Sequence, residues 1–246
     1  MLIGPQFLPE NLKNLRARMA GAAVRAGRSE DCVTLLAVSK GQPAEMISAA
    51  MQLGLRDFGE NYLQEALPKI DAVDAALTDA STGPIWHFIG QLQSNKTRTV
   101  AERFDWVHTV DRLRIAERLS AQRSHHAPRL NVCIQVQLAP EANKGGVAVA
   151  DVAALAAAIQ TLPRLRLRGL MCIPPAESGF DAQLLWFEQL AGIQAALNRT
   201  GAALDTLSMG MSADLEAAIV AGSTLVRIGT ALFGTRPVGG ESTIAT

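Results

Sequence analysis

The sequence is poor in cysteine and has no net charge, and each shortage excludes a class of protein. It contains three cysteines in 246 residues, at the widely spaced positions Cys32, Cys133 and Cys172. An odd number at this spacing predicts reduced, mostly buried thiols and argues against a disulfide framework or a zinc site. The 23 basic residues are balanced by 23 acidic ones, so no net field favours nucleic acid or an anionic membrane as a partner.

Long apolar runs are also missing. No uncharged apolar segment reaches the length needed to span a membrane, and residues 1–20 lack the basic stretch, apolar core and cleavage site of a secretory signal. We therefore expect a soluble, cytoplasmic protein. Apolar residues are nevertheless plentiful, at 48% against 19% charged, which is enough for a large buried core.

Short strand-like runs alternate with helical, alanine-rich patterns along the chain. An amphipathic helix is expected first, at about residues 9–27. The strand-like runs cover residues 33–40, 55–61, 85–90, 104–110, 130–138, 165–173, 204–210 and 224–230. Alternation of this kind predicts βαβ units and a parallel sheet. Eight strands, with the first and last both strongly apolar, favour a single closed (β/α)8 TIM barrel over an open doubly wound sheet.

No linker rich in proline, glycine or serine divides the chain. We therefore expect one domain over residues 1–246, with a core at about 9–236 and a flexible polar tail at 237–246. Helix starts are expected at Pro43 and at Ser94.

Lys40 is unusual because it ends the apolar run "VTLLAVSK". In a parallel barrel, sites form at the C-terminal ends of the strands, and strand parity places Lys40 on the same face as Leu36 and Val38. One interpretation is an exposed lysine just past a strand. The other is an amine desolvated at the barrel mouth, where burial and nearby cations lower a lysine pKa and allow a Schiff base with a carbonyl.

Arg227 is the second unusual residue, because it interrupts the apolar run "TLVRIG" and shares a strand face with Leu225 and Gly229. A buried guanidinium is costly unless it is paired. Arg227 is therefore either part of a structural salt bridge at the barrel rim or a residue that binds a ligand, with its charge close enough to lower the lysine pKa.

The third feature is a candidate phosphate site after the last two strands. Ser212, followed by Asp214 and Glu216, is expected to cap a helix, and Gly229 and Thr230 offer close backbone approach and a hydroxyl. Loops after the seventh and eighth strands are the recurrent phosphate site of this architecture. Together with a lysine and an arginine, they predict a pocket for a phosphorylated carbonyl compound, either pyridoxal 5′-phosphate or a sugar phosphate in a Schiff-base aldolase.

Other polar residues have plainer interpretations. Two histidines in apolar strand patterns are expected to be satisfied core or rim residues, three carboxylates to be solvated, and two lysines to lie on the surface. These are His87 and His108, then Asp57, Glu60 and Asp111, then Lys96 and Lys144. The sequence contains none of the common metal-protease, nucleophile-elbow or nucleotide-binding motifs, so no metal is expected.

Six motifs in order resemble the pyridoxal-phosphate homeostasis protein family, which has the fold of the alanine racemase N-terminal barrel. The motifs are "LLAVSKGQP", "DFGENYLQEALPK", "WHFIGQLQSNK", "VHTVDR", "LRGLMCIPP" and "LSMGMSADLEAAIVAGSTLVRIGTALFG". The match covers about residues 9–236, with the opening helix as an addition to the barrel. The first residues and the tail carry no family signature.

The resemblance implies that pyridoxal 5′-phosphate is the cofactor, and it implies a role for six residues. Lys40 would carry the cofactor as a Schiff base, Ser212, Gly229 and Thr230 would hold its phosphate, Arg227 would face the pyridine nitrogen, and Asn61 would lie beside the ring.

Carbanion chemistry on this cofactor is strongest when an acid keeps the pyridine nitrogen protonated. Arg227 stays charged and cannot supply that proton. Racemases on this fold add a second base, a tyrosine from an extra β-domain of a partner subunit, whereas this chain ends with the barrel and has Tyr62 as its one tyrosine. We therefore hypothesise a monomeric, non-catalytic carrier that delivers the cofactor to apo pyridoxal-phosphate enzymes. The alternatives are a weak racemase-like enzyme and a Schiff-base sugar-phosphate aldolase.

Overall fold

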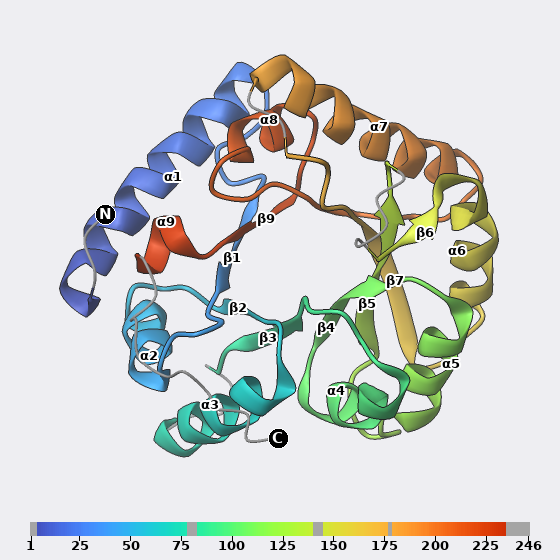
Figure 1. Ribbon diagram of the computed structural model, residues 1–246, viewed down its shortest axis with the longest axis horizontal. Helices are drawn as coiled ribbons and strands as arrows, with labels where there is room; N and C mark the ends of the chain where they lie inside the picture. Colours follow the sequence, from blue (N-terminus) through green and yellow to red (C-terminus); the bar gives the residue numbers. More distant parts are fainter. Residues whose placement is uncertain (1–3, 78–82, 140–144, 177–178, 235–246) are drawn as a thin grey trace, which may run out of the picture.

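Eight parallel strands close into a barrel that is ringed by helices (Figure 1). A computed structural model describes residues 4–77, 83–139, 145–176 and 179–234. The strands follow the order β4-β3-β2-β1-β9-β8-β7-β5, and pairing of β4 with β5 closes the circle. They are β1 (Thr34–Val38), β2 (Asp57–Glu60), β3 (Ile85–Phe88), β4 (Trp106–Val110), β5 (Leu130–Gln137), β7 (Leu165–Met171), β8 (Thr206–Ser208) and β9 (Leu225–Ile228). The closed barrel and all eight predicted strand positions are confirmed.

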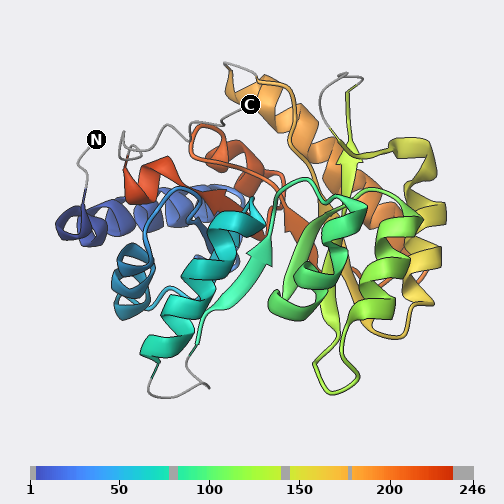
Figure 2. The ribbon, with the colours of Figure 1, turned by 60° about the horizontal axis from the view of Figure 1, so that its bottom comes forward.

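The helices lie outside the strands, as the view in Figure 2 also shows. They are α1 (Leu8–Arg25), α2 (Ala44–Gln52), α3 (Leu63–Ala76), α4 (Thr97–Arg103), α5 (Leu113–Gln122), α6 (Val152–Gln160), α7 (Phe180–Arg199), α8 (Leu215–Val220) and α9 (Thr230–Phe233). The predicted opening helix is α1, which packs against α8 and α9 and so completes the ring. Three short 3-10 helices, at Pro5–Phe7, Ser94–Lys96 and Val149–Asp151, precede longer helices. Helix starts after Pro43 and at Ser94 are confirmed.

Strand alternation divides the buried residues into two layers. In β1, Leu35 and Ala37 belong to the hydrophobic cluster that the helices cover, whereas Leu36 and Val38 point the other way, into the barrel. Leu36 stands in register with Arg227 of β9. Residues paired in register share a face of the sheet, so Arg227 points into the barrel interior.

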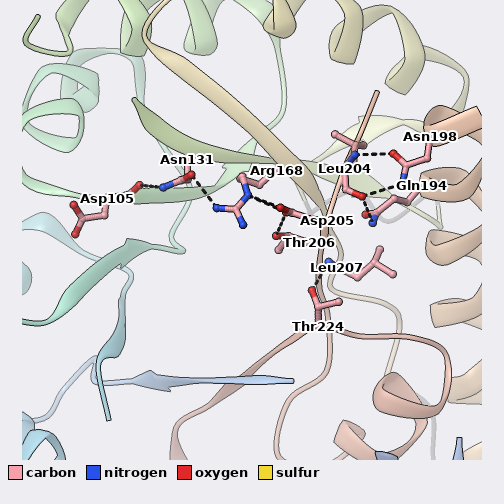
Figure 3. A network of polar contacts seen from close by, with 10 residues as sticks. All are labelled: Asp105, Asn131, Arg168, Gln194, Asn198, Leu204, Asp205, Thr206, Leu207 and Thr224. Carbon is pink, nitrogen blue, oxygen red and sulfur yellow. Dashed lines mark hydrogen bonds and ion pairs between the residues drawn. The ribbon is translucent and has the colours of Figure 1, made fainter. Parts of the chain in front are cut away.

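The N-terminal end of the barrel is closed by a network of polar contacts (Figure 3). The Arg168 Nε atom lies 2.8 Å from Asp205 Oδ1, which also accepts a hydrogen bond from the Thr206 hydroxyl. Arg168 Nη1 donates to Asn131 Oδ1 at 3.2 Å, and Asn131 Nδ2 donates to the carbonyl of Asp105 at 3.2 Å. Four strands are thereby joined at this end.

Two features differ from the sequence-based expectation or fall outside it. A two-residue strand, β6 (Val147–Ala148), pairs with β5 beside the barrel and is too short to leave a pattern in the sequence. Lys144 and the tail at 237–246 lie outside the described residues.

Among the helices that the structure describes, none has the length and apolar character needed to cross a membrane.

Candidate functional site

Lys40 lies half-buried at the C-terminal mouth of the barrel, just past the end of β1. Both of its neighbours are held in place. The Ser39 N–H donates to the Gly59 carbonyl at 3.0 Å, and the Gly41 N–H donates to Glu65 Oε2 at 3.0 Å. Gly41 has a φ of 71°, a left-handed conformation that favours glycine. The backbone that carries Lys40 is therefore fixed on both sides.

A buried ion pair supports this segment from below. Lys69 Nζ lies 2.7 Å from Glu60 Oε1 and donates to the Ser39 carbonyl at 2.9 Å. The Ser39 hydroxyl donates to the same Glu60 oxygen at 2.6 Å. Burial raises the pKa of Glu60, and the ammonium of Lys69 opposes that shift. The expectation that Glu60 is a solvated carboxylate is wrong, because β2 continues through it and α3 delivers a lysine to neutralise it.

A small cavity of about 40 Å³ adjoins Lys40. Its lining residues are Val38, Lys40, Gln42, Gly229, Thr230 and Gly234. Gly229 immediately precedes α9, where the first backbone N–H groups of a helix have no partner within the helix. The structure thus brings the predicted lysine together with two of the three predicted phosphate residues.

Arg227 is 5% exposed and binds uncharged groups. Its Nη1 atom donates to the Ser208 carbonyl at 2.6 Å and to the Ser208 hydroxyl at 3.0 Å, and its Nη2 atom donates to the Cys172 carbonyl at 2.9 Å. Burial lowers the pKa of Arg227, although a guanidinium remains charged at neutral pH. Within the described ranges Arg227 makes no ion pair, so the structural salt bridge that the sequence left open is not found.

Asn61 directly follows β2 and has an unsatisfied atom. Its Oδ1 is buried without a hydrogen-bond partner among the described residues, a costly state for a polar atom. The backbone of Gly90 packs so closely that a Cβ there would lie 2.0 Å from the Asn61 carbonyl oxygen. Asn61 lines a pocket of about 360 Å³ together with Tyr62 and the exposed Lys96. The surface position expected for Lys96 is confirmed.

Ser212 lies in the loop between β8 and α8, and its predicted role as a helix cap is wrong. The N-cap position belongs to Asp214. A tight turn delays the helix, because the Met211 N–H donates to Asp214 Oδ1 at 2.6 Å. The Ser212 carbonyl accepts a hydrogen bond from Arg18 at 3.0 Å, and Arg18 pairs with Glu216 at 2.7 Å. Ser212 is not among the residues lining the cavity beside Lys40.

His87 and His108 are both fully buried and satisfied, as expected. The two rings share a hydrogen bond of 2.9 Å, and Asp57 lies 3.0 Å from His87. Asp57 is therefore paired, contrary to the expectation of a merely solvated carboxylate. Asp111, whose side chain is 18% exposed, pairs with the more exposed Arg112 at 2.7 Å.

Lys69 and Ser208 support the site but were missed by sequence reasoning. Lys69 falls on the face of α3 that also buries Ala66, Ile70 and Val73, and a lysine on a buried face usually has a charged partner. That pattern could have identified it. A serine within a short apolar strand, as at Ser208, carries no comparable pattern.

The cysteines are free, and two of them are buried as predicted. Burial raises the pKa of both Cys133 and Cys172 to about 12, so neither is a thiolate at neutral pH. In the described part of the chain, no three histidine, cysteine or acidic residues form a group that could hold a metal ion.

The chain resembles known proteins over nearly its whole length. The family model described as "Alanine racemase, N-terminal domain" matches residues 10–237. A protein of Pseudomonas aeruginosa is 55% identical over 232 residues, covering 94% of this chain and 97% of that one. A protein of Escherichia coli K12 is 52% identical over 229 residues, covering 93% and 97%. Both relatives are named pyridoxal phosphate homeostasis protein.

Solved structures agree with these sequence matches. PipY of Synechococcus elongatus, solved with pyridoxal phosphate bound, is 35% identical with a TM-score of 0.79, covering 92% of this chain and all of that one (100%).

Proposed function

The chain belongs to the family of pyridoxal phosphate homeostasis proteins, and from this premise we propose that it binds pyridoxal 5′-phosphate at the C-terminal mouth of its barrel. One observation carries the proposal: Lys40, Gly229 and Thr230 line one cavity, which places the lysine beside the start of a helix. An amine can bind the aldehyde of this cofactor, and a helix start favours its phosphate.

Two further observations fit the same ligand. The buried Asn61 Oδ1 has no partner among the described residues, so a bound molecule has a polar atom left to satisfy. Arg227 carries a buried positive charge whose hydrogen bonds go to uncharged groups and on which the carboxylate of Asp214 acts without a direct ion pair among the described residues, which favours an anionic ligand.

The chain's own residues would divide the binding as follows. Lys40 would hold the cofactor covalently through Nζ, Gly229 and Thr230 would receive the phosphate with help from Ser212, and Arg227 would face the pyridine nitrogen. Asn61 would lie beside the ring. Gly229 suits such a place because its backbone runs close to β1, where a Cβ would lie 3.4 Å from the Val38 carbonyl oxygen.

We propose that the chain holds and delivers the cofactor without robust catalysis. When bound, pyridoxal phosphate supplies a ring that can accept electrons from a carbanion. Arg227 weakens that capacity, because a guanidinium keeps its proton and leaves the pyridine nitrogen unprotonated. The names of the relatives point in the same direction, since they describe homeostasis of the cofactor. Apo pyridoxal-phosphate enzymes are the proposed acceptors, and the proposed carrier is a monomer.

A weak racemase-like activity is the second candidate. One observation favours it: Tyr62, 60% exposed, lines the same pocket as Asn61 and is the chain's one tyrosine. Racemisation needs a second base, and Tyr62 is the one residue of that type available. A sugar phosphate is disfavoured as the ligand, because the relatives are named for pyridoxal phosphate.

The test is a titration of purified protein with pyridoxal phosphate, followed by absorption spectroscopy and by transfer to an apo-enzyme. We expect a visible band of bound cofactor and reactivation of the acceptor. Lys40→Ala should lose the band, whereas Lys96→Ala, which removes an exposed lysine at the same mouth, should keep it. Rapid racemisation of an amino acid, measured by chiral chromatography and abolished in Tyr62→Phe, would reject the carrier in favour of the enzyme.

A further inference from the structure

A continuous chain of side chains runs through the barrel interior to Arg227. Asp57 Oδ1 lies 3.0 Å from His87 Nε2, and His87 Nδ1 lies 2.9 Å from His108 Nε2. His108 Nδ1 lies 2.8 Å from the Ser208 hydroxyl, which accepts from Arg227 Nη1 at 3.0 Å. We call these five residues the interior chain.

The two ends of the interior chain differ in kind. Arg227 can only donate hydrogen bonds, and an ionised Asp57 can only accept them. If every contact carries one proton, Arg227 donates to Ser208, Ser208 to His108, His108 to His87, and His87 to Asp57. Both histidines are then neutral, with the proton on Nε2 and a lone pair on Nδ1.

Two other assignments satisfy all of the contacts with an ionised Asp57, and each needs a doubly protonated histidine. A doubly protonated His87 would donate both to Asp57 and to His108, and His108 would then donate from Nδ1 to Ser208. This arrangement places a second cation in the barrel interior near Arg227. A doubly protonated His108 would donate both to His87 and to Ser208. His87 would then donate to Asp57, and this arrangement would likewise add a cation near Arg227. Burial lowers the pKa of both histidines, and the charge of Arg227 adds to that effect on His108, so the neutral arrangement is favoured.

The surroundings hold the interior chain in place. The His87 ring stacks on Trp106 with centroids 5.3 Å apart and an interplanar angle of 10°. The guanidinium of Arg168, which also binds Asp205 and Asn131, lies over Trp106 at 4.7 Å from the ring centroid. The side chain of Asp57 is 23% exposed and lines a pocket of about 290 Å³ at the N-terminal end of the barrel.

We propose that Asp57, His87, His108 and Ser208 are positioning residues that hold the Arg227 guanidinium in one orientation at the cofactor site through hydrogen bonds donated in a single direction. The consequence for the cofactor rests on the proposed function, whereas the direction of the interior chain does not. The N-terminal end of the barrel would thereby help to set the geometry of the opposite end.

The direct test is nitrogen NMR of the histidine rings in ligand-free protein. We expect His87 and His108 each to show one protonated Nε2 and one unprotonated Nδ1 at neutral pH. The exposed His125 and His126 serve as internal references. A doubly protonated His87, or a His108 protonated on Nδ1, would overturn the proposed direction.

Asp57→Asn tests whether the carboxylate sets that direction. An amide of the same shape can either donate or accept, so the interior chain is no longer restricted to one direction. We expect a second set of His108 resonances with the proton on Nδ1. An unchanged single set in this variant would show that Asp57 does not control the interior chain.

Ser208→Ala tests the link to the cofactor site. It removes the hydroxyl that joins Arg227 to His108, and we expect the dissociation constant for pyridoxal phosphate to rise about tenfold, with a shift of the visible band. Ser223→Ala is the matched control, because Ser223 is also fully buried but donates to backbone carbonyls outside the interior chain. Equal affinity and identical spectra for both variants would overturn the positioning role. Failure of the wild-type protein to bind the cofactor would instead reject the proposed function and leave the NMR result standing.

Discussion

The two ends of the barrel treat their polar groups differently. At the N-terminal end, Arg168, Asp205 and Thr206 satisfy one another in a closed network. At the C-terminal mouth, Asn61 keeps a buried oxygen without a partner among the described residues, and Arg227 binds only uncharged groups there. A protein that leaves polar groups unmatched at one end is less stable there than it could be, and such places are where ligands bind.

The mouth also contains a buried ion pair, Glu60 and Lys69, beneath Lys40, although the second carboxylate oxygen, Glu60 Oε2, has no hydrogen-bond partner among the described residues. Lys69→Met should have the largest effect on stability, because it leaves a buried carboxylate without its cation. We expect a loss of about 3–5 kcal/mol in the free energy of unfolding, measured by urea denaturation. The double variant with Glu60→Gln should recover much of that loss. A single variant as stable as the wild type would show that the pair does not support the mouth.

The backbone is packed more closely at Gly90 in the mouth than at Gly192 on the outer helix α7. Gly90→Ala places a Cβ against the Asn61 carbonyl and should lower the free energy of unfolding by about 1–3 kcal/mol, because the backbone must shift. The matched control is Gly192→Ala on the exposed face of α7, where a Cβ meets nothing within 4 Å. That change should stabilise the protein by about 0.5–1 kcal/mol. Equal effects in calorimetry would contradict the difference in packing.

The histidines link the two ends and make stability depend on pH. Burial lowers the pKa of His87 and His108 below the ordinary value of 6.5, so the unfolded chain takes up protons that the folded protein resists. Their contribution is fully present above that ordinary value and is lost as the pH falls below it. We expect the free energy of unfolding to decrease from pH 7 to pH 5.5. Replacing the exposed His125 and His126 by glutamine should leave this pH dependence unchanged. If the pH dependence disappears in that control, it does not come from the buried histidines.

The smallest effect is expected at the N-terminal end. Asp205→Asn weakens an ion pair whose side chains are 24% and 48% exposed, and such pairs contribute about 0.2–1 kcal/mol. Cofactor binding should be unchanged. A marked loss of cofactor affinity in this variant would show that the pair of Arg168 and Asp205 acts on the mouth as well.

Sequence patterns predicted the barrel well and the site in part. Each strand leaves a short apolar run between helical segments, so the positions of β1 to β9 could be found, apart from the two-residue β6. Strand alternation placed Arg227 on the same face as Leu225 and Gly229. Contacts between distant residues could not be predicted in the same way. Glu60 appeared to be solvated because its partner comes from the next helix, and Ser212 appeared to cap α8 because the turn closed by Asp214 is not visible as a pattern.

The most direct test of a cofactor site at the mouth is to find where the cofactor attaches. Protein loaded with pyridoxal phosphate would be reduced with borohydride, digested and examined by mass spectrometry, with Lys40→Ala treated in parallel. We predict that the added mass lies on the peptide containing Lys40, at the mouth, and is absent from that peptide in the variant. A stoichiometric label on Lys69 or Lys96 instead, unchanged in Lys40→Ala, would contradict this prediction.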